Sequence, residues 1–489
     1  MSASQETRQV TLSHPHSIFV NGEWASPSSD GLIEIVSPVS EEVIFTVAEA
    51  READIDRAVA AARAAFDQGP WPRLSHAERA DYLLRFADAL KLRNAELGHA
   101  WTAQIGALYA RAQNVGLSAV TTFKRYAEMA STFPFSEPHT PSDGHGRALI
   151  VREPVGVVAA IVPWNAPLPL AANKTAPALL AGCTMVLKAS PETPLEAYIM
   201  AEVADEIGLP PGVFNVVCAH RSASEHLVRN PDIDKVSFTG SSATGRRIAS
   251  ILVERMARYT MELGGKSAAI VLDDMETDRA VGRLASGICA NSGQICAALS
   301  RVIVPRKRYD DFVDGFATAM RALTPGDPYD PSSALGPLAM QRQLERVASY
   351  VEKGKAEGAK LVVGGKPPPG LNRGYYFEPT LFADVDNQMT IAQEEIFGPV
   401  LCLIPAEDDD DAVRIANASP YGLNGAIFTH DNRRAYELAC KVRSGNVSQN
   451  RFRVDFGVAF GGVKQSGVGR EGGKEGLNGF LEPKTMLLD

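Results

Sequence analysis

The chain has 489 residues, which predicts roughly two to four domains and allows a large buried core. Hydrophobic residues make up 45% and charged residues 22%, the balance of an ordinary globular protein. The net charge of −9 argues against nucleic acid and anionic membranes as partners, because both attract basic surfaces. No apolar run is long enough to span a membrane, and residues 1–16 are too polar for a secretory signal.

The six cysteines are sparse for this length and lack Cys-x-x-Cys spacing. We therefore expect reduced thiols and a cytoplasmic protein rather than a disulfide framework. His14 and His16 lie close together in a polar terminal segment, where we expect both to be solvated. No metal site is predicted from this spacing.

The first part of the chain is predicted to be mainly helical. Asn21-Gly22 predicts a tight turn between two short strands. Apolar residues at helical spacing predict helices over 54–66 and 76–92, and helical structure continues over 97–131. Prolines and glycines then exclude a helix over 133–146. With the apolar residues that follow, this segment favours an extended ribbon that leaves the main body.

The rest of the chain alternates strands and helices in two series. The first series has predicted strands at 157–162, 184–187, 213–217 and 235–238, with helices at 170–181, where Pro177 favours a kink, and at 195–207. The second has strands at 268–272, 301–304, 360–363, 400–404, 425–429 and 446–448, with helices at 308–322, 339–357, 408–417 and 432–442. This alternation predicts parallel βαβ units, and so two α/β bodies divided near residue 262.

Two signals point to a nucleotide cofactor, and each has a simpler explanation. The strand 235–238 runs into Gly240 and Gly245 at the start of a helix, where backbone N–H groups favour an anion. An ordinary strand–helix turn is an equal alternative, because the pattern is not Gly-x-Gly-x-x-Gly. Lys188 follows the strand 184–187, so it either reaches a ribose or phosphate or is a solvated surface lysine.

Three residues are candidates for catalysis. Cys296 follows a small polar turn and is either a reactive thiol or an inert buried one. Glu262 precedes two glycines, which would let a general base move, although most strand-end glutamates simply face water. Asn165 lies between two prolines and could donate to an oxyanion or serve as an ordinary turn residue. A Cys–His pair is unsupported, because the nearest histidines in sequence are His226 and His430.

The order of seven short motifs resembles the NAD(P)-dependent aldehyde dehydrogenase superfamily, over about residues 18 to 485. The motifs are Pro-Trp-Asn165, Lys188, Phe238-Thr-Gly-Ser241, Glu262-Leu-Gly-Gly265, Gly293-Gln-Ile-Cys296, Glu394-Glu-Ile-Phe-Gly-Pro399 and Phe460-Gly-Gly-x-Lys-x-Ser-Gly467. Each motif is weak by itself, but seven in this order are very specific.

The resemblance implies that the chain oxidises an aldehyde to a carboxylic acid. Cys296 would be the nucleophile, and the Asn165 amide and the Cys296 backbone N–H would hold the oxyanion. Glu262 would activate the water that hydrolyses the resulting thioester, with Lys174 and Glu471 as its supports. Two alternatives are a CoA-acylating semialdehyde dehydrogenase, which usually lacks such a base, and a non-catalytic protein of the same fold.

The resemblance also implies a cofactor site, with NAD as first choice and NADP as an alternative. Glu395 would hold the nicotinamide ribose, Phe397 would pack beside the nicotinamide, and Lys188 would bind the adenosine ribose. The full set of cofactor residues is Ile161, Val162, Pro163, Trp164, Lys188, Gly240, Ser241, Gly245, Leu263, Gly264, Glu395 and Phe397. Pro191 stands where NAD-preferring members usually carry a glutamate, which weakens the exclusion of a 2′-phosphate. Ser448 and Ala459 also depart from the usual tryptophan and proline.

The substrate tunnel implied by the resemblance is mainly apolar. Its predicted lining is Phe123, Met129, Ile295, Phe456 and Phe460. We therefore expect a medium-sized, uncharged aldehyde. An acidic semialdehyde is the alternative, because Arg451 and Arg453 lie in the same loop as Phe456.

The predicted fold is α/β, with a Rossmann-like cofactor domain, a catalytic domain and a protruding β-ribbon arm. We expect the dinucleotide-binding domain at 1–135 and 153–261 and the catalytic domain at 262–465. The arm and the C-terminal strand are expected at 136–152 and 466–489. The resemblance implies that this arm joins subunits into a homodimer or homotetramer.

Overall fold

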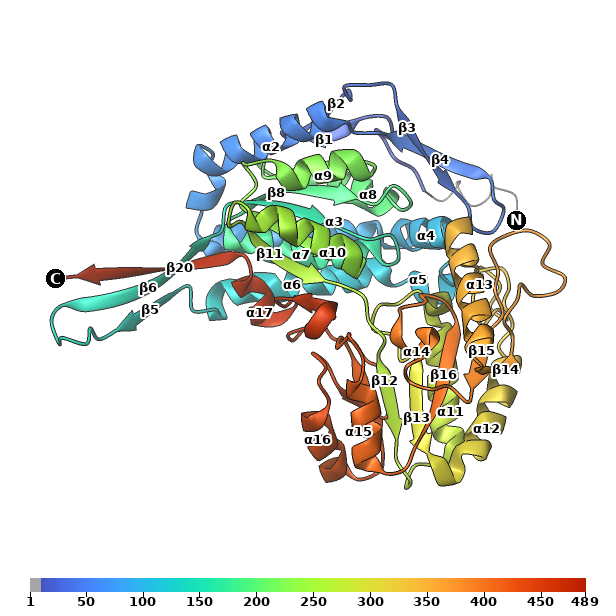
Figure 1. The fold of residues 1–489 in the computed structure, drawn as a ribbon. Coiled ribbons are helices and arrows are strands. Elements are labelled where there is room, and N and C mark those ends of the chain that lie inside the picture. The colour runs from blue at the N-terminus through green and yellow to red at the C-terminus, as the bar shows by residue number, and fades with distance from the viewer. Residues whose placement is uncertain (1–9) are drawn as a thin grey trace.

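The computed structural model describes residues 10–489, which form two α/β bodies and a ribbon that projects from them (Figure 1). The predicted fold class is therefore confirmed. The expectation that residues 1–16 are not a secretory signal falls largely outside the described residues. Within residues 10–489, the helices are all too short or too polar to cross a membrane.

The first body is built on an eight-stranded sheet in the order β19-β11-β10-β7-β8-β9-β1-β2. Its five central strands are parallel: β7 (Val157–Ile161), β8 (Thr184–Ala189), β9 (Phe214–Cys218), β10 (Lys235–Thr239) and β11 (Arg258–Glu262). The antiparallel edges are β19 (Gly467–Val468) and the hairpin of β1 (Ile18–Val20) and β2 (Glu23–Ala25). Asn21 and Gly22 both have positive φ, as the predicted tight turn requires.

Helices cover both faces of this sheet. Side chains of β7 point alternately into the two apolar cores, one on each face of the sheet. Val157 and Ala159 pack with α2 (Glu52–Asp67), α9 (Arg221–Arg229) and α10 (Ser242–Val253). Val158 and Ala160 pack with the opposite layer. That layer contains α3 (His76–Leu92), α4 (Asn94–Ile105), α6 (Val115–Thr132), α7 (Pro167–Ala181) and α8 (Leu195–Glu206).

The structure refines two helix predictions. The helical region predicted over 97–131 consists of α4, the short α5 (Tyr109–Ala112) and α6. Gly106 ends α4 with φ of 73° and packs so closely on Pro337 that a Cβ would collide with the proline ring. Helix α7 begins at Pro167, earlier than predicted, because proline fits the first helical turn, and it continues through Pro177.

The second body is built on a seven-stranded sheet in the order β14-β15-β16-β13-β12-β17-β18. Its strands are β12 (Ala268–Val271), β13 (Arg301–Pro305), β14 (Lys360–Val363), β15 (Thr380–Ala383), β16 (Val400–Ala406), β17 (Gly425–Phe428) and β18 (Ser448–Gln449). All neighbours are parallel except β14 and β15. One face is covered by α11 (Thr277–Cys289) and α12 (Tyr309–Arg321), and the other by α13 (Gln341–Ala356), α14 (Thr390–Gln393), α15 (Asp409–Asn417) and α16 (Asn432–Lys441).

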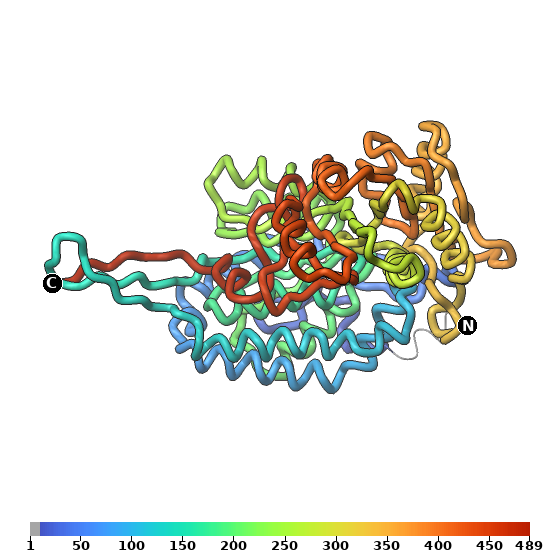
Figure 2. Tube along the Cα trace, turned by 90° about the horizontal axis from the view of Figure 1, so that it is seen from below, coloured from blue at the N-terminus to red at the C-terminus, as the bar shows by residue number. Residues whose placement is uncertain are grey.

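The projecting ribbon joins residues far apart in the chain. The hairpin of β5 (Ser136–His139) and β6 (Arg147–Pro154) is extended by the C-terminal strand β20 (Leu481–Leu488), which pairs antiparallel with β6 (Figure 2). The short helix α17 (Gly473–Asn478) leads into β20. A separate hairpin of β3 (Leu32–Val36) and β4 (Val43–Ala48) was not predicted from the sequence.

Candidate active site

A cavity of about 450 Å³ opens where the first sheet faces the second body. The carboxyl ends of β7 and β10 contribute one wall, as expected for a ligand site in an open parallel sheet. These residues are Pro163, Trp164, Asn165, Thr239, Gly240 and Ser241. The second body contributes Cys296, Glu395 and Phe397, together with Arg342, Gln343 and Arg346 of α13. The cavity therefore lies between the two bodies.

The segment before Cys296 is a turn in an unusual backbone conformation. Asn291, Ser292 and Gly293 all have positive φ, which is rare for residues other than glycine. A Cβ on Gly293 would collide with the backbone of Gly398, so only glycine fits there. The Ser292 hydroxyl donates to the Gly336 carbonyl at 2.7 Å, and the Ala339 N–H donates to Oε1 of Gln294 at 2.9 Å. The turn is thus fixed by buried contacts.

This turn leaves the Cys296 thiol half-buried on the cavity wall. Burial raises the pKa of the Cys296 thiol, and the nearby Glu395 and Glu262 carboxylates raise it further. All six cysteines are free. Four of the others are buried, including Cys289 at the end of α11, and Cys440 is exposed on α16. Cys296 is the cysteine that lines the cavity.

Asn165 is buried and held against the same turn. Its side-chain Nδ2 donates to the Gln294 carbonyl at 2.9 Å, and its own carbonyl accepts from the Trp101 indole at 3.1 Å. Both Asn165 and Cys296 line the cavity, so the structure brings these two predicted residues together.

Glu262 is the last residue of β11 and is only 2% exposed. Neither carboxylate oxygen has a well-formed hydrogen bond among the described residues. Burial raises the pKa of Glu262 well above its usual value, and the Glu471 carboxylate raises it further, while Lys174 acts in the opposite direction. Such an environment is typical of a functional carboxylate rather than a solvated strand end.

Lys174 and Glu471, the residues predicted to support Glu262, lie close enough for their charges to act on it. They form a buried ion pair that joins α7 to the C-terminal segment, and Lys174 Nζ also donates to the Ser237 hydroxyl at 3.2 Å. One oxygen of Glu471 has no hydrogen-bond partner among the described residues. The ion pair therefore places buried polar groups beside Glu262, and one of their oxygens lacks a hydrogen-bond partner among the described residues.

The glycines around Glu262 allow carboxylate side chains to pack closely against the backbone. They were expected to let its carboxylate swing. Instead, a Cβ on Gly264 would collide with the Glu395 carboxylate, and a Cβ on Gly461 would collide with that of Glu262. The Gly265 N–H donates to Oε1 of Glu395 at 3.1 Å. The glycine motifs therefore make room for two buried carboxylates.

Glu395 and Phe397 form the cavity wall opposite β7. Burial raises the pKa of Glu395 to about 7. The hydrogen bond from the Gly265 N–H acts in the opposite direction and lowers this pKa. Phe397 has φ of 65°, a strained conformation for a non-glycine residue, and its ring meets the Trp164 ring edge-on with centroids 5.3 Å apart. Its carbonyl accepts a hydrogen bond from Gln343 at 2.7 Å, while Arg346 donates to the Glu395 carbonyl at 2.5 Å.

Arg342, Gln343 and Arg346 of α13 were missed by the sequence analysis. The available signal was the spacing of Arg342 and Arg346, which places two cations on one face of the predicted helix. Nothing in the sequence said that this face points toward a cavity in the other half of the chain.

The predicted cofactor residues fall into two groups. Eight of them line the cavity: Pro163, Trp164, Gly240, Ser241, Leu263, Gly264, Glu395 and Phe397. The other four do not: Ile161 and Val162 are buried at the end of β7, Gly245 packs on Leu263 inside α10, and Lys188 is buried at the end of β8. Burial lowers the pKa of Lys188.

An apolar cluster surrounds Cys296. It contains Ile295, Phe456 and Phe460, three of the residues predicted to line the substrate pocket, and the Phe456 and Phe460 rings lie 4.7 Å apart. The cluster also contains Phe452 and Val454, which were missed. Their signal is the alternation of charged and apolar residues over 451–456.

The structure corrects one member of the predicted pocket and leaves another untested. Phe123 is fully buried and stacks on Phe86 in the core of the first body, with ring centroids 4.6 Å apart. Met129 is partly buried and packs against the same core, outside the cluster around Cys296, and its place in the substrate pocket stays a prediction. Helical spacing predicted that α6 has an apolar face, but that face is used for packing on α3.

Comparisons with known proteins agree with this geometry. The model of the aldehyde dehydrogenase family matches residues 24–486. Geranial dehydrogenase of Castellaniella defragrans is 42% identical over 479 residues, which cover 98% of this chain and 100% of that protein.

Two solved structures are also similar. An aldehyde dehydrogenase of Mycobacterium tuberculosis complexed with NAD+ has 43% identity and a TM-score of 0.95, covering 98% of this chain and 99% of that one. A cysteine-to-alanine mutant of aldehyde dehydrogenase C from Pseudomonas syringae, complexed with NAD+ and octanal, has 38% identity and a TM-score of 0.94, covering 98% of each chain. The chain belongs to the aldehyde dehydrogenase family.

Proposed function

We propose that this enzyme oxidises an uncharged, apolar aldehyde to its carboxylic acid with NAD, using Cys296 as nucleophile. The observation that carries the proposal is the position of Cys296. Its thiol lines a cavity with Asn165 and the Gly240–Ser241 turn on one side, and an apolar cluster surrounds it on the other.

The residues of the cavity fit NAD. Gly240 has no side chain, and the twelve-residue helix α10, capped by the Ser241 hydroxyl, begins at the cavity, where its N-terminus favours a pyrophosphate. The buried Glu395 carboxylate can accept hydrogen bonds from a ribose, and the Trp164 and Phe397 rings offer apolar walls. When bound, NAD supplies the acceptor for the hydride that leaves the aldehyde carbon. The relatives from M. tuberculosis and P. syringae were both solved with NAD+.

Attack requires a thiolate, and Cys296 holds its proton at neutral pH because its pKa is raised. Glu262, whose pKa is also raised, is suited to take that proton when the thiol attacks. Attack forms a hemithioacetal whose oxygen becomes negative. Nδ2 of Asn165 uses one N–H on the Gln294 carbonyl and keeps a second for that oxygen, alongside the Cys296 backbone N–H.

Loss of hydride leaves a thioester on Cys296, which water must hydrolyse. Glu262 first passes the thiol proton on through the Lys174–Glu471 pair behind it, and then, again a carboxylate, it serves as the base that activates this water. A role as general base would account for the presence of the Glu262 carboxyl group at a buried position, where burial favours its neutral form.

The substrate class follows from the cluster of Ile295, Phe452, Val454, Phe456 and Phe460. An acidic semialdehyde is less favoured, because Arg453 is paired with Asp455 at 3.2 Å and Arg451 is exposed. We expect octanal to have a higher kcat/KM than succinic semialdehyde. A strong preference for succinic semialdehyde would contradict the apolar assignment.

The test of the proposal is formation of NADH, followed by its absorbance, when the protein is mixed with NAD and octanal. We expect turnover without coenzyme A, since Glu262 provides the base for hydrolysis. Turnover that depends on coenzyme A would favour an acylating enzyme. No signal with a broad aldehyde panel would favour a non-catalytic protein.

The assembly and the domain division belong to the same proposal. The β5–β6–β20 ribbon has two unpaired edges, which suits it to join subunits in a homodimer or homotetramer. We assign cofactor binding to 1–135 and 153–261, catalysis to 262–465, and assembly to 136–152 and 466–489. Six free cysteines are in keeping with a cytoplasmic enzyme.

A further inference from the structure

A buried lysine lies behind the cofactor cavity. Lys266 follows the two glycines after the Glu262–Leu263 segment and is only 2% exposed. Its Nζ has no hydrogen-bond partner among residues 10–489. Burial lowers the pKa of Lys266, while the Glu395 carboxylate acts to raise it. A buried cation is costly unless an opposite charge or polar groups compensate it, so the position of Lys266 calls for a negative partner.

The backbone at Lys266 is fixed on both sides. The Gly265 N–H donates to Oε1 of Glu395 at 3.1 Å, and the Lys266 carbonyl accepts from Nε of Arg301 at 2.9 Å. Arg301 is itself buried, and its other hydrogen bonds go to neutral amide oxygens. A second buried cation therefore lies beside Lys266, which makes the need for a negative partner greater.

A small cavity connects Lys266 with Glu395. Its volume is about 10 Å³, room for one water molecule, and both residues line it. Glu395 also lines the cofactor cavity of about 450 Å³, so it borders both spaces. A water molecule in the small cavity can accept a hydrogen bond from an ammonium group and donate one to a carboxylate.

The other titratable groups that face this pair do not replace Lys266. Arg346 of α13 also lowers the pKa of Glu395, but its side chain is exposed and its hydrogen bonds go to backbone carbonyls and a tyrosine hydroxyl. Three further groups are neutral at pH 7 because burial raises the pKa of each: Cys296, Cys402 and Tyr421. Lys266 is therefore the buried one of the two cations that act on Glu395.

We propose that Lys266 is the buried counter-ion of Glu395, coupled to it through one water molecule in the small cavity, and that it keeps Glu395 a carboxylate. The carboxylate form can accept hydrogen bonds from two ribose hydroxyls, whereas protonation turns one oxygen into a donor. Lys266 is thus a positioning residue, which sets the pH range in which the ribose is held. This inference rests on the proposed function, which gives Glu395 the ribose.

The first test is the affinity for NADH as a function of pH, followed by NADH fluorescence. In the wild type, the affinity is expected to rise with pH through the pKa of Glu395, about 7. Lys266→Met keeps the length of the side chain but removes its charge, so this midpoint should move up by about 1 pH unit. Glu395→Gln should abolish the midpoint. The matched control is Lys235→Met, which removes a buried lysine bound to Thr260 in the first body and should leave the midpoint unchanged.

The second test needs no cofactor. Melting temperatures above the pKa of Glu395 are compared for the wild type, Lys266→Met, Glu395→Gln and the double variant. Glu395→Gln should raise the melting temperature more in the Lys266→Met background than in the wild type, because there it removes a buried charge without a partner. If Lys266→Met does not fold, a double variant that folds supports the coupling. A double variant that is also unfolded would assign Lys266 to packing and overturn the inference.

Two other results would overturn the inference. One is a midpoint that Lys266→Met leaves where it is in the wild type. The other is an equal effect of Glu395→Gln on the melting temperature in both backgrounds. Wild-type protein that does not bind NADH, or a Glu395→Gln variant that binds it like the wild type at every pH, would contradict the ribose assignment in the proposed function instead. The melting temperatures would then still decide the inference.

Discussion

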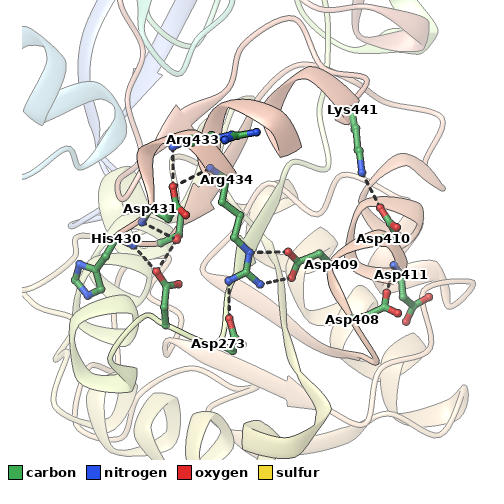
Figure 3. A network of polar contacts seen from close by, with 12 residues as sticks. Asp273, Asp408, Asp409, Asp410, Asp411, His430, Asp431, Arg433, Arg434 and Lys441 are labelled. Carbon is green, nitrogen blue, oxygen red and sulfur yellow. Dashed lines mark hydrogen bonds and ion pairs between the residues drawn. The ribbon is translucent and has the colours of Figure 1, made fainter.

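The enzyme contains two networks of charged side chains that differ in how completely they are satisfied. The first is the buried group of Glu262, Lys174 and Glu471, in which both Glu262 oxygens and one Glu471 oxygen lack partners among the described residues. The second lies near the surface of the second body, around Arg434 (Figure 3). We interpret the first network as the groups proposed for chemistry and the second as groups that hold helices together.

In the surface network every labelled carboxylate has a partner. Arg434 donates two hydrogen bonds to Asp409 and one to Asp273, all at 2.7 Å, and so ties α16 to α15 and to the end of β12. Asp408 caps α15 and Asp431 caps α16 by accepting backbone N–H groups of the first helical turn. The hydrogen bond to Asp409 raises the pKa of Arg434, in keeping with a stabilised cation.

The largest expected effect is that of Cys296→Ala, which removes the proposed nucleophile. We expect NADH formation to be abolished while the melting temperature stays close to that of the wild type, because the thiol is only half-buried. Steady-state rates and thermal unfolding measure the two quantities. Near-normal turnover would remove Cys296 from its assigned role.

Glu262→Gln should separate activity from stability. Loss of a general base is expected to lower kcat about 100- to 10,000-fold. Since the pKa of Glu262 is raised in the folded state, its contribution to stability is fully present below its unfolded pKa, near 4.5, and is lost as the pH rises through the folded value. The variant should therefore be more stable than the wild type at about pH 8, and this advantage should shrink toward about pH 4.

Thermal unfolding of both proteins across this pH range measures the difference. Equal melting temperatures at every pH would show that the Glu262 carboxylate is not destabilising. For wild-type activity the same pKa predicts a rate that rises with pH, since the base acts only when it is deprotonated.

Asn165→Ala should have the third largest effect. Removal of one oxyanion donor is expected to lower kcat about 100-fold or more. Asn165→Asp tests the donor specifically, because it keeps the size of the side chain but loses the N–H groups. Recovery of activity in the aspartate variant would argue for a packing role against the Gln294 carbonyl.

The smallest effect is expected for Arg434→Gln, which breaks the surface network. Because the side chain is 31% exposed and its charges are screened, we expect a loss of about 1 kcal/mol in the free energy of unfolding. Its kcat/KM for octanal should stay within about twofold of the wild type. Denaturant unfolding and steady-state kinetics measure both, and a large loss of activity would show that the two networks are coupled.

The sequence predicted most of the fold and the reactive wall of the site. Strand–helix alternation gave the two bodies, and the short motifs predicted that Cys296, Asn165, Glu395 and Phe397 would meet at one cavity. These motifs can be recognised in the sequence because each one meets a local requirement of backbone conformation or packing. The positive φ of Gly293, for example, leaves glycine as the one residue that fits.

The residues that the sequence did not predict are those whose role depends on a distant partner. Arg342 and Gln343 look like an ordinary polar helix start until α13 is seen against the first body. Phe123 was placed in the substrate pocket, yet it packs on Phe86, because helical periodicity identifies an apolar face without saying what covers it.

The sequence by itself determined the α/β architecture, the family and the candidates for the reactive residues, since these depend on local periodicity and on glycines and prolines at fixed positions. The tertiary structure alone decided the electrostatics of the site. Glu262, Glu395 and Cys296 have raised pKa values because strands and loops from both halves of the chain exclude water around them. Desolvation depends on how the whole chain packs, so it cannot be predicted from any single stretch of the sequence.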